Sequence, residues 1–220
     1  MATYVVRVWV PDRPGVLGAV ASRVGAVRGD VVGIDILERG AGRAIDELVV
    51  DLPDDDLVPL LVAEISQVDG VDVEDVRAAS AVPDARLAAL EAAALLVEEQ
   101  SADGLLSTLT AHACQDFEGE WAAVVGRESA EHLAAVGEPP PAAWLGAFVE
   151  GSRSSEMVAA GECGPDDVAW TTLADGALSL VVGRKGRPFR ARERRQLAAL
   201  ARIADRRWAE VGAGAPLSRK

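Results

Sequence analysis

Apolar and polar residues alternate along residues 4–10, as expected for a strand with one buried face. The side that we expect to be buried consists of Tyr4, Val6, Val8 and Val10. The apolar spacing then changes to three or four residues, which is typical of an amphipathic helix with the stripe Val16, Val20, Val24 and Val27. Pro14 and Gly15 separate the two patterns, and we expect Pro14 in the first turn of the helix. The chain therefore opens with a strand and a helix that packs against a sheet.

The same two patterns continue to residue 76. They predict strands through residues 32–36 and 48–52, a second helix that starts near the acidic residues 54–56, and a weaker fourth strand over residues 71–76. The expected core-facing residues are Val32, Ile34, Ile36, Leu48, Val50, Leu52, Leu57, Leu60, Leu61, Ile65 and Val68. In the last strand the alternation slips at Glu74 and Asp75. The element order predicts an α+β, ferredoxin-like βαββαβ unit with both helices on one face of an antiparallel sheet.

Residues 10–17 read Val-Pro-Asp-Arg-Pro-Gly-Val-Leu. This segment is similar to the Asp-Arg-Pro-Gly-Val-Leu signature that joins the first strand to the first helix in ACT domains. Residues 1–80 also match the element order and element lengths of that family. The resemblance implies a small ligand, often an amino acid, that binds near this loop and the start of the second strand, commonly across a dimer interface.

The resemblance supplies a set of candidate ligand-binding residues: Asp12, Arg13, Gly15, Val16, Leu17, Asp30 and Val31. Free backbone N–H groups at a helix start favour anions or zwitterions, and Gly15 and Gly18 let a ligand approach the backbone. Asp30 and Val31 stand where the family often has Asn-Ile. A carboxylate accepts from an ammonium group but cannot donate to a carboxylate, which favours a basic or amine ligand, or none. The alternative is that these residues form only a strand-to-helix turn and an exposed strand end.

The carboxy-terminal half also mixes helices and strands. Residues 84–100 predict a stiff connector helix with the apolar stripe Leu87, Leu90, Ala94 and Val97. A helix over residues 103–117 follows, with Leu105, Leu109 and Ala113 on its buried side. We expect strands at residues 121–125, 132–136, 168–173 and 177–182, an amphipathic segment around Trp144 and Phe148, and a hairpin turn at Asp175-Gly176.

Residues 176–184, then Pro188-Phe189, then a long helix resemble the ending of GAF domains. The resemblance covers about residues 85–212 and implies an α+β domain with an antiparallel sheet that binds a small molecule or dimerises. The residue pattern of cyclic-nucleotide-binding members is missing, and no bilin-type cysteine position can be assigned. We therefore divide the chain into an ACT domain (1–80), a helical connector that can be the first helix of the next domain (81–100), a GAF-like domain (101–212) and a flexible tail (213–220).

The net charge of −13 is segregated along the chain: residues 1–80 carry −8, residues 81–183 carry −14 and residues 184–220 carry +9. The last helix is rich in arginine, but its own apolar stripe faces a core: Leu197, Leu200, Ala204, Trp208 and Val211. The rest of the chain would repel phosphate, so we expect no nucleic-acid partner.

A seven-residue repeat suggests a different role for these charges. Asp84, Glu91 and Glu98 form an acidic line on the connector helix, and Arg195 and Arg202 form a basic line on the last helix. In GAF-like folds the first and last helices usually pack side by side. We therefore hypothesise that the two lines face each other, either within one chain or across a dimer.

Candidate catalytic chemistry is sparse. His112 and Cys114 are two residues apart on a predicted helix and point about 200° apart, while His132 and Cys163 have no neighbouring catalytic pattern. We find no phosphate-binding loop, metal-ligand spacing or nucleophile motif, so we expect no catalytic residue, no metal and no cofactor. No apolar run is long enough to span a membrane, and the start of the chain lacks a signal pattern, which predicts a cytoplasmic protein.

The leading hypothesis is a cytoplasmic, non-enzymatic regulator that binds an amino acid or related metabolite. It would act as a homodimer through a separate, unidentified protein effector. Two alternatives stay open: a ligand-free dimerisation scaffold, and an enzyme with an unrecognised site in the carboxy-terminal half.

Overall fold

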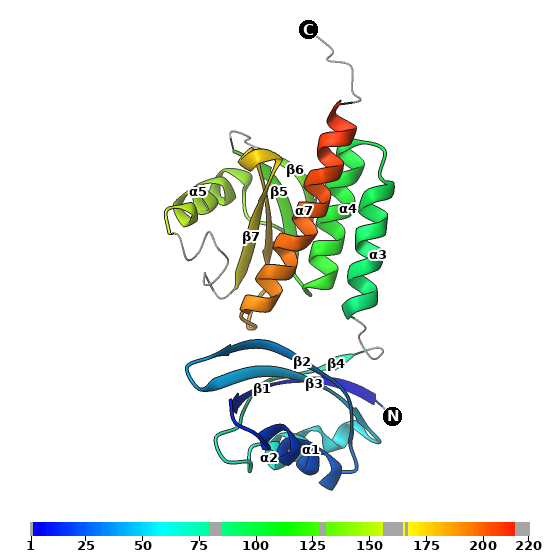
Figure 1. The fold of residues 1–220 in the computed structure, drawn as a ribbon, viewed down its shortest axis with the longest axis vertical. Coiled ribbons are helices and arrows are strands. Elements are labelled where there is room, and N and C mark those ends of the chain that lie inside the picture. Colours follow the sequence, from blue (N-terminus) through cyan, green and yellow to red (C-terminus); the bar gives the residue numbers. More distant parts are fainter. Residues whose placement is uncertain (1, 80–84, 128–130, 156–164, 166, 214–220) are drawn as a thin grey trace. The chain divides into compact units, whose positions relative to one another are not determined.

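The chain divides into two compact units, Met1–Asp84 and Ala85–Lys220. A computed structural model describes the chain except for residues 1, 80–84, 128–130, 156–164, 166 and 214–220 (Figure 1). Cys163, the acidic residue Asp84 and most of the expected tail lie outside the described residues.

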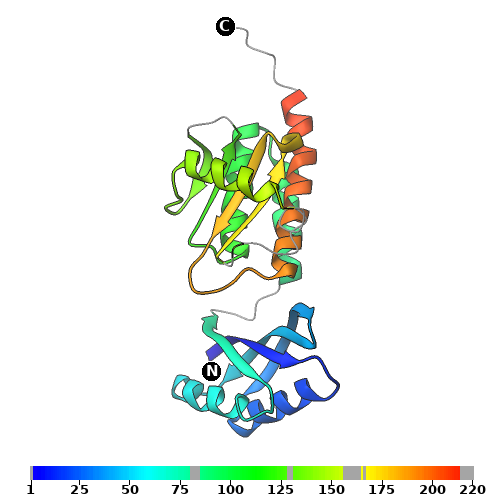
Figure 2. The same ribbon diagram turned by 90° about the vertical axis from the view of Figure 1, so that its left-hand side faces the viewer.

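Unit 1 is a four-stranded antiparallel sheet with two helices on one face (Figures 1 and 2). Its elements are β1 (Ala2–Pro11), α1 (Val16–Ala26), β2 (Asp30–Gly40), β3 (Arg43–Leu52), the 3-10 turn η1 (Asp55–Leu57), α2 (Val58–Ile65) and β4 (Asp72–Ala79). The strand order is β2-β3-β1-β4, and each neighbouring pair is antiparallel. The predicted α+β, ferredoxin-like βαββαβ fold is confirmed.

The core of unit 1 lies between the sheet and the helices. The alternation of β1 and β3 and the valine spacing of α1 place these residues there: Tyr4, Val6, Val8, Val10, Val16, Val20, Val24, Val27, Ala44, Leu48, Val50, Leu52, Leu61, Ile65 and Val71. Burial of branched apolar side chains contributes about 1.5–3 kcal/mol each, so this face supplies the main folding energy of the unit.

Four local predictions in unit 1 need correction. The register of β2 shifts between Val31 and Gly33, so Val31, not Val32, packs on the core, and Val32 is 39% exposed. Ile34 pairs with Leu48 on the expected side of the sheet but is 48% exposed, because β2 is an edge strand. Leu60 is also exposed, because α2 buries Leu61 and Ile65 instead. Pro14 precedes α1, since Gly15 adopts a left-handed backbone conformation and the helix begins after it. The predicted slip in the fourth strand is a real irregularity, a register shift opposite Arg7 and Val8.

Unit 2 is a second four-stranded antiparallel sheet with helices on both faces (Figure 1). Its elements are α3 (Ala85–Glu98), α4 (Ala102–Asp116), β5 (Trp121–Gly126), β6 (His132–Val136), α5 (Ala142–Arg153), β7 (Val168–Leu173), the turn η2 (Ala174–Gly176), β8 (Leu178–Gly183) and α7 (Ala191–Ala213). The strand order is β6-β5-β8-β7. Helices α3, α4 and α7 build the larger core on one face, and α5 covers the other face with a smaller one.

The connector helix α3 packs through the side opposite to its predicted stripe. Ala92 and Leu96 are fully buried, whereas the stripe residues Leu87, Leu90, Ala94 and Val97 are exposed. Because α3 consists largely of Ala and Leu, it is apolar nearly all round, and its periodicity does not identify the side that packs.

The described residues of the two charged lines, Glu91 and Glu98 on α3 and Arg195 and Arg202 on α7, do not pair within the chain. Helices α3 and α7 do lie side by side, as expected, and Arg207 donates a hydrogen bond to the carbonyl of Glu99 at 2.8 Å. Among the described residues, however, no ion pair joins Glu91 or Glu98 to Arg195 or Arg202, and all four side chains are exposed. The interchain form of the hypothesis is therefore the one that stays open.

Candidate functional site

The loop between β1 and α1 leaves the start of α1 open. Gly15 precedes the helix at φ 90°, and a Cβ built on it would have no atom within 4 Å. The N–H of Ala19 bonds to the carbonyl of Gly15 at 3.0 Å as the helix begins. The earlier N–H groups of a helix have no partner within it, so this end of α1 presents donors to a negatively charged or carbonyl group.

The loop itself is held by backbone hydrogen bonds. The N–H of Asp12 donates to the carbonyl of Gly42 at 2.9 Å, and the N–H of Arg13 donates to the carbonyl of Pro11 at 2.8 Å. The Arg13 guanidinium also lies 3.5 Å from Asp69 on the neighbouring loop. The predicted residues Asp12, Arg13, Gly15, Val16 and Leu17 are thus brought together at one end of the sheet.

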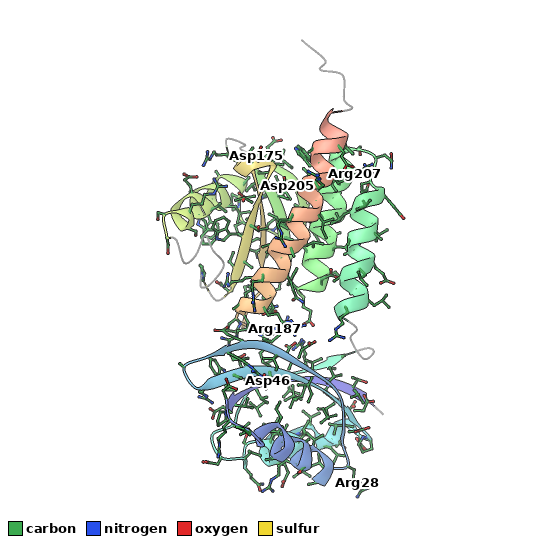
Figure 3. All side chains as sticks on the ribbon, in the orientation of Figure 1. Arg28, Asp46, Asp175, Arg187, Asp205 and Arg207 are labelled. Carbon is green, nitrogen blue, oxygen red and sulfur yellow. The ribbon has the colours of Figure 1, made fainter. Side chains whose placement is uncertain are left out.

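Asp46 is a charged residue on the core-facing side of β3. It pairs in register with Val8 of β1 and Ile36 of β2, and it is 2% exposed (Figure 3). Its Oδ1 has no hydrogen-bond partner among the residues that the structure describes. Burial raises the pKa of this carboxyl above its ordinary value; the positive charge of Arg39 opposes that shift, and the negative charge of Asp12 adds to it. In the strand register Asp46 lies three residues from Arg43, the partner of Pro11, where the loop begins.

Asp46 is absent from the predicted site residues, although the sequence pattern of β3 contains a signal for it. Ala44, Leu48, Val50 and Leu52 alternate along β3 and all face the core. Asp46 occupies the same side of that alternation, which makes it a charged residue at a position where an apolar one is expected.

Asp30 and Val31 lie at the opposite end of the sheet from the loop. Asp30 pairs with Asp51, which in turn pairs with Thr3, whereas the loop follows Pro11, which pairs with Arg43. Eight strand residues separate Thr3 from Pro11 in register, or about 26 Å at 3.3 Å per residue. One small ligand therefore cannot contact both groups of predicted residues within a single chain.

Two of the reactive side chains of unit 2, Cys114 and His132, have structural partners. The Cys114 thiol donates to the carbonyl of Gly119 at 3.2 Å, and burial raises the pKa of this thiol, which disfavours the nucleophilic thiolate. A ring nitrogen of His132 lies 2.9 Å from the carbonyl of Pro140. Within the described ranges, no cluster of three or more His, Cys, Asp or Glu side chains has the geometry of a metal site.

The sheet face beneath α5 is filled by side chains. Ala123 and Val181 from the sheet and Leu145 from α5 are fully buried there, and they form one cluster with Val125 and Val149.

In the described part of the chain, none of the helices is long and apolar enough to cross a bilayer.

Several solved structures are similar to parts of the chain at low identity. The ACT domain of a GTP pyrophosphokinase from Chlorobium tepidum is 15% identical with a TM-score of 0.29, covering 36% of this chain and all of that one. A formyltetrahydrofolate deformylase from Pseudomonas putida is 19% identical with a TM-score of 0.31, covering 40% of this chain and only 36% of that one. A free methionine-R-sulfoxide reductase from Neisseria meningitidis, solved with its substrate, is 16% identical with a TM-score of 0.42, covering 62% and 96% of the two chains.

No curated protein matches the chain. The resemblance of residues 85–212 to GAF domains stays a prediction. The model of the ACT domain family matches residues 4–70, the span that contains the β1–α1 loop and Asp46. Residues 4–70 of this chain form an ACT domain.

Proposed function

We propose that the ACT domain binds an amino acid or a related amine at the β1–α1 loop and thereby regulates a separate protein. The observation that carries this proposal is the buried carboxyl group of Asp46 on the strand next to the loop-bearing β1, whose Oδ1 has no hydrogen-bond partner among the described residues. The role is regulatory rather than catalytic, because the loop offers binding groups and no nucleophile with a neighbouring base.

The chemistry of the two ends of such a ligand fits the loop. A buried carboxylate without a partner is unfavourable, and an ammonium group brings three N–H donors and the opposite charge. Asp12 adds a second negative charge nearby. The open N–H groups at the start of α1 would donate hydrogen bonds to the carboxylate of an amino acid, which the carboxylate of Asp30 cannot do.

Asp30 and Val31 enter the proposal through a second copy of the chain. They lie on β2, which is an edge strand of the sheet, about 26 Å along the strands from the loop. If ACT domains of two chains associate, the strand start of one copy can approach the loop of the other. We therefore propose a homodimeric sensor, in which the bound ligand changes the arrangement of the two copies.

A binding screen tests the proposal. The full chain is screened by thermal shift against the twenty amino acids at pH 7.5, because a ligand at a hundredfold excess over its Kd stabilises by about 2.7 kcal/mol. Each hit is then compared by calorimetry with its decarboxylated amine and with its hydroxy acid, which lacks the ammonium group. We expect the amine, which lacks only the carboxylate that contacts α1, to bind more weakly than the amino acid, and the hydroxy acid, which lacks the ammonium group, to lose binding.

Asp46→Asn and Asp56→Asn form the matched pair of variants. Asp46→Asn should weaken binding at least tenfold, while Asp56→Asn, on the turn before α2, should bind like the parent. An unchanged affinity in Asp46→Asn would refute the role of Asp46 and leave binding at the loop intact. If no amino acid or amine binds the parent chain, the sensor proposal itself is wrong and the ligand-free scaffold replaces it.

A further inference from the structure

An apolar stripe on α3 faces solvent. Leu87, Leu90 and Val97 are 52%, 69% and 56% exposed, and Ala94 between them is exposed as well. Single exposed leucines are common, but a row of them along one helix side is typical of an interaction surface. The opposite side of α3 already packs on its own unit through Ala92 and Leu96, so the exposed stripe is not needed for that packing.

Unpaired acidic side chains border this stripe. Glu91 and Glu98 follow Leu87 and Leu90 around the helix and are exposed, with no ion pair to any described residue. Two turns of helix separate them, a rise of about 10.5 Å. The stripe therefore carries a row of negative charge on one flank.

Helix α7, next to α3, exposes the opposite charge. Arg195, Arg202 and Arg206 are exposed and have no carboxylate partner among the described residues. Arg195 and Arg202 are also seven residues apart, so the rise between them along the helix is about 10.5 Å, as it is between Glu91 and Glu98. The acidic and basic rows thus match in spacing and in sign without meeting in one chain.

A groove runs between α3 and α7 beside the basic row. It has a volume of about 420 Å³ and is lined by Val97, Ala199, Arg202, Ile203, Arg206, Arg207 and Glu210. Val97, Ala199 and Ile203 form the apolar part of its lining. Arg207 pairs with Glu210 in the rest of it, whereas Arg202 and Arg206 have no carboxylate partner among the described residues. This lining suits a helix that presents leucines flanked by carboxylates.

Helix α3 itself has that composition. We infer that the exposed faces of α3 and α7, here called the α3–α7 surface, bind the same surface of a second copy of the chain. The leucine stripe of each copy lies against the groove of the other, and Glu91 and Glu98 of each copy face Arg195 and Arg202 of the other. A two-fold interface uses each complementary patch twice, which is why both patches occur on one chain.

The charge pattern favours a second copy over other occupants. A nucleic acid would meet the basic row but also the acidic row and the leucines beside it, and an acidic peptide would leave the stripe uncovered. The surface also lies wholly in unit 2, so it is separate from the ligand site proposed in unit 1.

Charge reversal with rescue tests the inference on the full chain. Analytical ultracentrifugation gives the dimer dissociation constant of the parent, of E91R/E98R, of R195E/R202E and of the variant that combines all four changes. We expect each double variant to raise the dissociation constant at least tenfold, and the fourfold variant to restore it, because the pairs then form with exchanged signs. An equimolar mixture of the two double variants should form a mixed dimer.

Two further variants separate the stripe from general surface effects. L90E should weaken association at least tenfold with an unchanged melting temperature, whereas L60E, at an exposed leucine of α2, should leave association unchanged. A parent chain that is monomeric at 100 µM would overturn the inference. A dimer whose dissociation constant is the same in all variants would overturn it equally, since another surface would then hold the copies together.

Discussion

The guanidinium Nη2 of Arg184 lies 2.7 Å from Oε1 of Glu193, and both side chains are buried. Arg184 also donates to the carbonyls of Phe117, Arg187 and Pro188, so it fastens the segment between β8 and α7. The other oxygen of Glu193 accepts the backbone N–H of Arg190 at 2.8 Å, at the start of α7. This pair therefore joins the last strand to the last helix.

Removal of one partner should destabilise unit 2 strongly. Glu193→Ala leaves the guanidinium of Arg184 buried without its counter-charge, and loss of one partner of a buried pair typically costs about 3–5 kcal/mol. Urea denaturation of the full chain measures this free energy of unfolding. Glu210→Ala, which removes the exposed partner of Arg207, is the control and should cost less than about 1 kcal/mol. Equal effects of the two variants would contradict the structural role of the buried pair.

The turn between β7 and β8 depends on Asp205 of α7. Its Oδ1 accepts the backbone N–H of Ala174 at 2.5 Å, and Ala174 and Asp175 both have positive φ angles, near 51° and 52° (Figure 3). Asp205→Ala should cost about 1.5–3 kcal/mol, because it removes a charge-assisted hydrogen bond from a strained turn. Hydrogen exchange should show faster exchange at Ala174 and its neighbours. Asp205→Asn keeps an acceptor oxygen, so it should retain most of the protection; if it behaves like Asp205→Ala, charge rather than the hydrogen bond holds the turn.

The fold of unit 1 could be predicted because each local pattern agreed with the others. The alternation of β1, the valine spacing of α1 and the turn residues between them all pointed to the same βαββαβ order. The position of Val32 could not be predicted, since a register shift by one residue in β2 leaves no mark on composition. The pairing of β2 with β3 decides which side chains of β2 face the core.

Only part of the predicted residue set lies close together in the structure, for a physical reason. The loop residues are consecutive in sequence and therefore close in space, whereas Asp30 lies across the length of the sheet from them. Asp46 was missed although it stands between Ala44 and Leu48 in the core-facing alternation of β3, because the alternation was read only for its apolar members. The exposed side of α3 could not be predicted from the sequence either, since a helix rich in Ala and Leu has two faces that are apolar enough to pack on the core.

A close approach at Gly183 predicts a position where a methyl group is not tolerated. A Cβ at this residue would come within 2.1 Å of the Trp121 ring, so Gly183→Ala must displace the ring. We expect a loss of about 1–3 kcal/mol, as for overpacked cores, and a change in tryptophan fluorescence. Gly146→Ala on α5 is the matched control: nothing lies within 4 Å of its added Cβ, and it should stabilise the helix by about 0.5–1 kcal/mol. A silent Gly183→Ala would mean that the Trp121 ring does not rest on β8.

The buried carboxyl of Asp46 makes the stability of unit 1 depend on pH. Burial raises the pKa of this group above its value in the unfolded chain, which is about 3.9. The folded state therefore binds the proton more tightly than the unfolded chain does. The resulting contribution to the free energy of unfolding is fully present below about pH 3.9 and is lost as the pH rises through the pKa of the folded state. Asp46→Asn cannot ionise, so its free energy of unfolding should not fall over that interval.

Urea denaturation at half-unit steps from pH 3.5 to 7.5 measures the difference between the parent and Asp46→Asn. The free energy of unfolding of Asp46→Asn, relative to that of the parent, should rise with pH and level off once the Asp46 carboxyl of the parent is fully ionised. Glu47→Gln, on the other face of β3, should show the opposite slope: burial raises the pKa of Glu47, but Arg7 and Arg77 outweigh it and hold that pKa below its usual value. The ionised form of Glu47 thus stabilises the fold above about pH 4.3, and this contribution is lost as pH falls. If Asp46→Asn runs parallel to the parent at every pH, Asp46 has an ordinary pKa and is not a buried, unpaired acid.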